Sequence, residues 1–121
     1  MSKEDKLSKL LAQILRATYL GAVDWEMTSP PFSLTKNTDN FVPTFLFAHY
    51  KAAVIVVYEE RGKHWTDEDS YSWSTSIRFG FMVSGEVITE SVRWSPVLGQ
   101  LYDAAKQHAS GVDSIIDNLL D

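Results

Sequence analysis

The chain has 121 residues, of which 45% are hydrophobic and 22% are charged, as is typical of one globular domain. It contains no cysteine, which excludes disulfides, thiolate nucleophiles and cysteine-based zinc sites and suits a reducing cytoplasm. The net charge of −5 argues against nucleic acid as a partner, because phosphates need a basic surface. Residues 1–20 lack the apolar core of a signal peptide, and the longest apolar run, 52–58, is far shorter than the ~20 residues of a membrane span. We therefore expect a soluble cytoplasmic protein.

The first predicted element is an amphipathic helix that begins after Ser2 and ends near Gly21. Ser2 is a suitable N-cap, and Glu4 and Asp5 follow where the helix dipole favours negative charge. Gly21 can take the left-handed conformation that ends many helices. Apolar residues recur between these limits at helical spacing: Leu7, Leu10, Leu11, Ile14 and Leu15.

Five β-strands are predicted downstream of this helix. They span residues 23–28, 41–48, 52–58, 71–81 and 86–94. The third is mostly β-branched, which favours a central strand covered at least partly on both faces. The fourth alternates strictly, with Tyr71, Trp73 and Phe79 on one face and serines on the other, as in a sheet with one covered side. Between the strands we expect a wide or bulged hairpin turn at 49–51, a polar loop at 59–70 and a short turn at Ser84-Gly85.

The strand at 41–48 is apolar on both of its predicted faces. One face carries Phe41, Phe45 and Phe47 with Pro43, and the other carries the residues between them and Ala48. Such a strand is either covered twice by its own chain or meets another subunit, because uncovered apolar surface usually marks an interface. A homodimer is therefore one of two open outcomes.

Helical segments close the chain. Ser95-Pro96 supplies an N-cap and a proline at the first helical position, and Ser110-Gly111 ends or kinks the helix. Residues 112–120 continue an apolar face, which we expect to dock, since each exposed apolar side chain forfeits ~1.5–3 kcal/mol. The predicted fold is α+β: one domain over residues 1–121, with an antiparallel sheet of about five strands covered on one face by an N-terminal helix and C-terminal helices.

The two ends of the chain carry a recognisable pattern. An opening helix leads to the strand residues Asp24-Trp25-Glu26, and the segment from Leu98 to Leu120 reads L-x-x-L-Y-x-x-A-x-x-x-A-x-x-V-D-x-I-I-D-x-L-L. This pattern resembles a loose group of small bacterial and phage-borne proteins that carry no assigned activity. The resemblance implies a similar fold and a bacterial or phage setting, and it supplies no functional residue.

Residues able to do chemistry are present but form no recognised catalytic, cofactor or metal motif. The three histidines have no second histidine or carboxylate at a metal-binding spacing such as H-E-x-x-H. His64 with Asp67, Glu68 and Asp69 could be drawn as a metal or acid–base cluster, but a solvated charged loop accounts for the same residues. We expect no enzymatic activity and no cofactor.

Trp65 is the residue that the predicted core does not need, because it lies inside the polar stretch 59–70. It has two interpretations. Either the loop folds back so that the indole covers a sheet edge, or Trp65 anchors another protein, since tryptophan beside charge is common in binding hot spots. In the second case, the candidate protein-binding residues are Trp65, His64, Asp67, Glu68 and Asp69.

Three functions remain open on this evidence. The first is a non-enzymatic protein-interaction domain, such as an inhibitor, an immunity-like factor or an adaptor of a bacterium or phage. The second is a small-molecule binding module or weak enzyme with a pocket between sheet and helices, lined by Trp25, Trp73, Phe79 and Tyr102. The third is an acidic secretion-type chaperone, which fits the size and charge of the chain.

Overall fold

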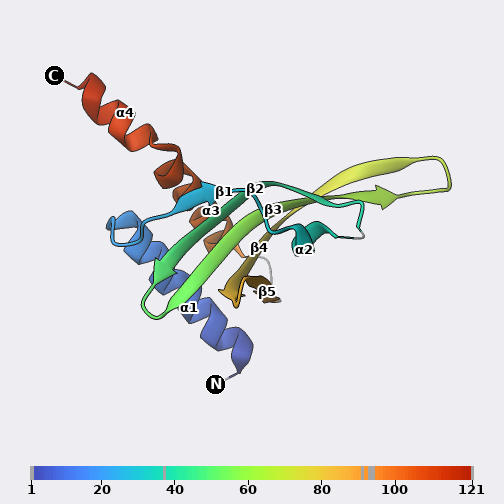
Figure 1. Cartoon of the computed structure of the whole chain (residues 1–121), viewed down its shortest axis with the longest axis horizontal. Coiled ribbons are helices and arrows are strands. Elements are labelled where there is room, and N and C mark those ends of the chain that lie inside the picture. Colours follow the sequence, from blue (N-terminus) through green and yellow to red (C-terminus); the bar gives the residue numbers. More distant parts are fainter. Residues whose placement is uncertain (1, 37, 91, 93–94, 121) are drawn as a thin grey trace.

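The computed structural model describes residues 2–36, 38–90, 92 and 95–120 (Figure 1). Its strands are β1 (Glu26–Thr28), β2 (Phe41–Tyr50), β3 (Ala53–Trp65), β4 (Tyr71–Val83) and β5 (Glu86–Glu90). They form one sheet in chain order, each antiparallel to the next. Its helices are α1 (Lys3–Tyr19), α2 (Phe32–Thr35), α3 (Pro96–Ser110) and α4 (Val112–Leu119). This arrangement confirms the predicted α+β fold.

The predicted helix ends are formed by the expected residues. The Asp5 N–H donates to Ser2 Oγ at 3.2 Å at the start of α1, and the Leu98 N–H donates to Ser95 Oγ at 3.4 Å at the start of α3. Each bond satisfies an amide that has no partner inside its helix. Gly111 follows α3 with a φ of 74°, the left-handed conformation that suits glycine.

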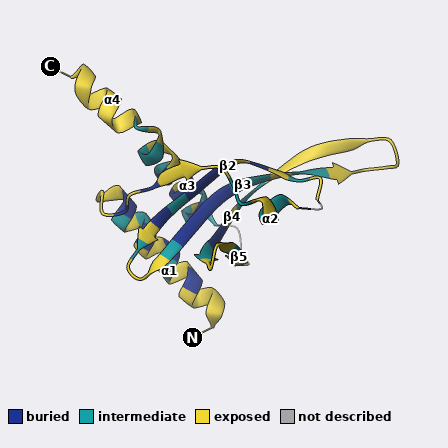
Figure 2. Cartoon of the chain, viewed as in Figure 1, coloured by how far each residue is buried: buried dark blue, intermediate teal, exposed yellow. Residues whose placement is uncertain are grey.

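The main core lies on one face of the sheet, called here the helical face. Helices α1 and α3 pack against each other and cover this face of β2, β3 and β4. The most deeply buried members come from both layers: Leu11, Ile14, Leu101, Val57 and Phe79. Figure 2 shows the buried residues concentrated in the middle of the sheet and on the helices facing it. Apolar burial of this kind is the main stabilising contribution to the fold.

Strand β1 is shorter than predicted, and its buried residues lie ahead of it. Val23 and Trp25 are buried before the strand begins, whereas Met27 within the strand is exposed. The Trp25 indole N–H donates to Thr18 Oγ1 at 3.0 Å, and this hydroxyl donates to the Ile14 carbonyl at 2.8 Å. Because these bonds give the buried indole N–H a partner, Trp25 can be buried without being part of a paired strand.

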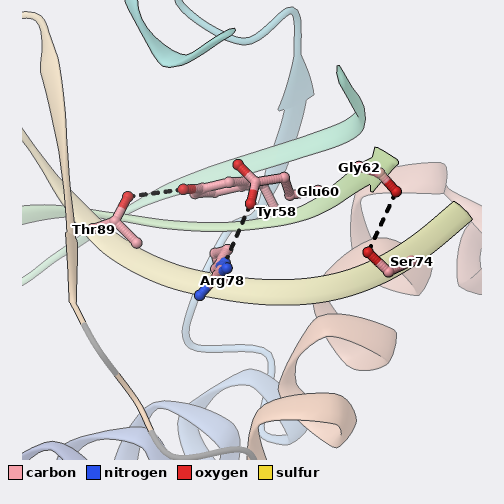
Figure 3. A network of polar contacts seen from close by, with 6 residues as sticks. All are labelled: Tyr58, Glu60, Gly62, Ser74, Arg78 and Thr89. Atoms are coloured by element: carbon pink, nitrogen blue, oxygen red, sulfur yellow. Dashed lines mark hydrogen bonds and ion pairs between the residues drawn. The ribbon is translucent and has the colours of Figure 1, made fainter. Parts of the chain in front are cut away.

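A smaller cluster covers part of the opposite face of the sheet, called here the outer face. Its buried residues are Val42, Phe45, Val56 and Tyr58, and Leu34 of α2 packs against them. The Tyr58 hydroxyl shares a 2.8 Å hydrogen bond with Thr89 Oγ1 (Figure 3). Around Val42 and Phe45, strand β2 is therefore covered on both faces by its own chain.

A β-bulge changes which face Phe41 occupies. Phe41 pairs with Arg61 while Thr44 pairs with Glu59, so β2 carries one extra residue between these pairs. Pro43 lies in this interval, where a residue that cannot donate a ladder hydrogen bond is tolerated. Phe41 is thereby moved to the helical-face side, away from Phe45. The prediction that these two phenylalanines share a face was wrong.

The segment predicted as a polar loop at 59–70 is largely strand. Strand β3 continues to Trp65, and Glu59–Trp65 pairs in register with Tyr71–Ile77 of β4. The loop proper is only 66–70. This correction has a physical reason: the polar residues of β3 have low strand propensity, but β4 supplies a strongly alternating partner, and pairing overrides propensity.

Two other boundaries differ from the prediction. The hairpin between β2 and β3 is confirmed, but its turn is tight, with only Lys51 and Ala52 between the paired residues Tyr50 and Ala53. Lys51 has a φ of 54°, as a two-residue turn requires. Strand β5 is described from Glu86 to Glu90 and Val92 is not in a strand, while the remaining positions of the predicted strand, 91, 93 and 94, lie outside the described residues.

Helix α4 forms, but it does not dock on the domain as expected. None of its residues is buried, and it projects away from the sheet beyond the end of α3 (Figures 1 and 2). Helices α1 and α3 already cover the inner part of the helical face, and the left-handed Gly111 turns the chain away from it. The apolar face of α4 is therefore exposed.

Replacing Tyr58 with phenylalanine tests the outer-face cluster. Burial raises the pKa of Tyr58 above the value of about 10 of a free tyrosine, although the bond to Thr89 opposes this. The unfolded chain thus loses this proton at a lower pH than the folded chain. The contribution of protonated Tyr58 to the free energy of unfolding is therefore fully present below pH ~10 and is lost as pH rises through the folded-state pKa. Urea unfolding at neutral and alkaline pH measures this effect. Tyr58→Phe should lower the free energy of unfolding by ~0.5–1.5 kcal/mol at neutral pH. Between neutral and alkaline pH, this free energy should fall less in the variant than in the wild type. An identical alkaline decline would contradict this.

Gly80 and Gly99 form a matched pair for alanine substitution. A Cβ at Gly80 would press into the backbone oxygen of Ile88 and lie 3.0 Å from Thr89 Cα, whereas a Cβ at Gly99 in α3 meets nothing within 4 Å. Gly80→Ala should lower the free energy of unfolding by ~1–3 kcal/mol through overpacking. Gly99→Ala should raise it by up to ~1 kcal/mol through helix propensity. Thermal or urea denaturation measures both, and equal effects would refute the tight packing of β4 against β5.

Candidate functional site: an aromatic strip on the β3–β4 hairpin

The outer part of the β3–β4 hairpin, residues 61–75, projects beyond the helices (Figure 1). The helical-face core reaches β3 and β4 at Ile55, Val57 and Phe79, with Ile77 packed at its margin. Residues farther along both strands are not part of that core. The projecting ribbon is therefore held by its own strand pairing and cross-strand contacts.

Four aromatic side chains line one side of this ribbon. This aromatic strip consists of Phe41, Trp65, Tyr71 and Trp73. Trp65 lies directly opposite Tyr71 with ring centroids 4.9 Å apart, and Trp73 lies 5.8 Å from Tyr71 and 5.5 Å from Phe41. The four residues remain 41–52% exposed. They form a continuous apolar surface on the helical-face side, past the end of the helices.

Two cations are interleaved with the rings. Lys63 Nζ lies 4.6 Å from the Tyr71 centroid and 5.7 and 5.8 Å from those of Trp73 and Trp65. The Arg61 guanidinium carbon lies 5.9 Å from the Phe41 centroid. Such cation–π contacts contribute ~0.5–1 kcal/mol each at exposed sites. They order the ribbon and place positive charge within the aromatic surface.

The opposite side of the ribbon is polar. His64 pairs with Ser72, and Gly62 pairs with Ser74, whose hydroxyl donates to the Gly62 carbonyl at 3.3 Å (Figure 3). Farther in, Glu60 forms an ion pair with Arg78, with 3.5 Å between Oε1 and Nε. The ribbon is thus amphipathic, and only its aromatic side offers extended apolar surface.

The tip of the hairpin is a compact charged turn. Asp67 Oδ1 accepts hydrogen bonds from the backbone N–H groups of Asp69 and Ser70, both at 2.8 Å. This carboxylate therefore shapes the turn. A surface depression beside it is lined by Trp65, Thr66, Asp67 and Glu68 and is open to solvent, so it has no walls that would enclose a small molecule.

The predicted site residues do not form one cluster. Trp65 belongs to the aromatic strip and lies in a strand, so the interpretation that a loop folds it over a sheet edge was wrong. His64 lies on the polar side, Asp67 is engaged in the turn, and the last two predicted residues are exposed at the tip: Glu68 and Asp69.

Sequence reasoning missed most of the strip. Tyr71 and Trp73 were assigned to the covered core, because their alternation with serine reveals a face but not what covers it. Lys63 and Arg61 lie in the stretch 59–70, which was predicted to be a loop. The pattern lysine–histidine–tryptophan opposite tyrosine–serine–tryptophan becomes visible only once 59–65 is recognised as a strand.

The other candidate chemistry is dispersed. Trp25, Phe79 and Tyr102 are in the packed core while Trp73 is in the aromatic strip, so these four do not line one pocket. Within the described ranges, no three histidine, aspartate or glutamate side chains lie close enough together to hold a metal ion. His108 Nε2 lies 3.0 Å from Asp24 Oδ1, which ties the end of α3 to the segment before β1.

Comparisons with known proteins add no further identification. No protein-family model matches the chain, no curated protein shows significant similarity to it, and no solved structure matches its fold. Among the described residues, no helix combines the length and apolar character required to cross a lipid bilayer. The aromatic strip is therefore the feature from which a function can be inferred.

Proposed function

We propose that this chain is a non-enzymatic protein-interaction domain that binds another protein through the aromatic strip. The observation that carries the proposal is the continuous exposure of three aromatic side chains on the ribbon and of Phe41 beside them on β2, which no other part of the described chain covers. Exposed apolar patches of this kind usually mark binding sites, and tryptophan and tyrosine supply a large share of binding energy at protein interfaces.

The ring geometry favours a protein partner over a stacked ligand. Neighbouring rings stand at 83–90° for Phe41–Trp73 and Tyr71–Trp73 and at 55° for Trp65–Tyr71, so they do not form a flat platform. Bases or sugar rings that stack in succession need faces open to solvent. The Lys63 ammonium also occupies space above the Tyr71 ring. An irregular aromatic surface instead suits side chains that pack between the rings.

The charges around the strip also favour a protein. Arg61 and Lys63 lie within it, but Glu59 on the same side of β3 forms an ion pair with Arg61 at 3.4 Å, and the acidic tip follows. Such alternation repels a continuous phosphate backbone. A partner that places apolar side chains on the rings and a carboxylate beside Lys63 satisfies both features.

The biological setting is proposed on the resemblance of the chain ends. A bacterial or phage-borne inhibitor, immunity-like factor or adaptor would use a small acidic domain of this kind inside the cell. Its acidic surface would speed association with a basic target, and added salt would slow it.

Affinity capture with paired variants tests the proposal. Tagged wild-type protein should recover a stoichiometric protein from bacterial or phage-infected lysate. The double variant Trp65→Ala, Trp73→Ala should bind that protein at least ~30-fold more weakly for each ring that acts as a hot spot. The double variant His64→Ala, Ser72→Ala alters the polar side of the same two strands and should bind as the wild type does.

Circular dichroism of the three proteins establishes that each is folded. Undiminished binding by the tryptophan variant would contradict the proposed site. Recovery of nucleic acid, or of no stoichiometric protein at low and moderate salt, would contradict the proposed function.

A further inference from the structure

Helix α4 carries a second uncovered apolar surface, at the other end of the molecule from the hairpin (Figure 1). The α4 stripe is formed by residues at helical spacing that are 39–78% exposed: Val112, Ile115, Ile116 and Leu119. Ser114 lies on the opposite side of the helix. An isolated helix of eight residues is marginal in water, so an uncovered stripe calls for a contact elsewhere.

A groove of complementary character lies between α1 and the β2–β3 turn. Its volume is about 290 Å³, and its lining is mainly apolar: Leu10, Tyr50, Ala52, Ala53, Ile55 and Phe81, with Gln13 and Lys51. The Gln13 side-chain amide donates to the Tyr50 hydroxyl and joins the two walls. Apolar side chains could leave water by entering this groove.

The charges of the groove and of α4 are opposite. Lys51 lines the groove, and Lys6 and Lys9 precede Leu10 and Gln13 by one turn on the same side of α1. Helix α4 carries aspartates and no cation, with Asp113 beside the apolar stripe. The groove therefore attracts α4 electrostatically as well as offering it apolar surface.

We propose that α4 of one copy lies in this groove of a second copy, and that the exchange is reciprocal in a two-fold homodimer. Within one chain, α4 projects away from the β2–β3 turn, so the contact forms between copies (Figure 1). Two helices only ~12 Å long have little surface to bury against each other alone. Reciprocal insertion buries two stripes and two grooves and closes after two subunits.

The α4 stripe and the groove are separate from the surface that the proposed function uses. The aromatic strip takes no part in the exchange, so it stays exposed for another protein in the dimer. Loss of the dimer therefore need not abolish partner capture, and failure of one proposal leaves the other testable.

Multi-angle light scattering of the full chain tests the dimer. Wild-type protein should have twice the 13.7 kDa mass of the chain, with dissociation favoured by salt. Ile116→Asp places a charge in the stripe and should weaken the dimer at least ~10-fold. Ser114→Asp adds the same charge to the opposite side of α4 and should leave the mass unchanged.

A second pair of variants identifies the groove. Leu10→Glu places a negative charge on the groove wall and should weaken the dimer, whereas Ala12→Glu, on the far side of α1, should not. Circular dichroism checks that both fold. A monomeric wild type at every soluble concentration would overturn the proposal, as would a dimer that persists in Ile116→Asp. A dimer that is weakened by Ile116→Asp but unchanged by Leu10→Glu would show that α4 docks elsewhere. This result would overturn the assignment of the groove as the docking site.

Discussion

The helical layer of this protein is shorter than the sheet that it covers, and the rest of the structure depends on this mismatch. Strands β3 and β4 have 13 residues each, which corresponds to a length of ~43 Å. Helices α1 and α3 bury the inner part at Val57 and Phe79, but the core does not extend to the outer part. Within the described part of the chain, the aromatic residues on the outer part therefore pack against each other, Lys63 and Arg61 rather than against the helices. Their exposure follows from the architecture.

The outer ribbon nevertheless has features that hold it in one conformation. A two-stranded hairpin alone is marginal in water. Here the strands continue from a buried sheet, the Asp67 carboxylate fixes the turn, and Trp65 packs across the ribbon on Tyr71. The bulge in β2 adds Phe41 at the base of the strip. A preformed aromatic surface loses less conformational entropy on binding than a flexible loop would, which suits a recognition element.

The sequence predicts some of these features and conceals others for physical reasons. Helix ends were predictable because Ser2, Ser95 and Gly111 act through local bonds and backbone conformation. The polar part of β3 was not predictable, because it forms a strand through its pairing with β4. The face on which Phe41 lies depends on a bulge. The bulge moves this side chain to the other face of the sheet but does not alter the apolar pattern of the sequence. Amphipathicity correctly indicated a helix in the segment 112–120, of which residues 112–119 are helical, but it does not specify which surface covers a helix.

Hydrogen–deuterium exchange along β3 and β4 tests the mismatch between helices and sheet most directly. Amides of the inner part, near Val57 and Phe79, should exchange only when the whole domain unfolds. Amides of residues 61–65 and 71–75 should exchange faster, through local opening of the projecting ribbon, although they belong to the same two strands. Uniform protection from one end of each strand to the other would contradict the account, because it would place the aromatic strip within the same cooperative core.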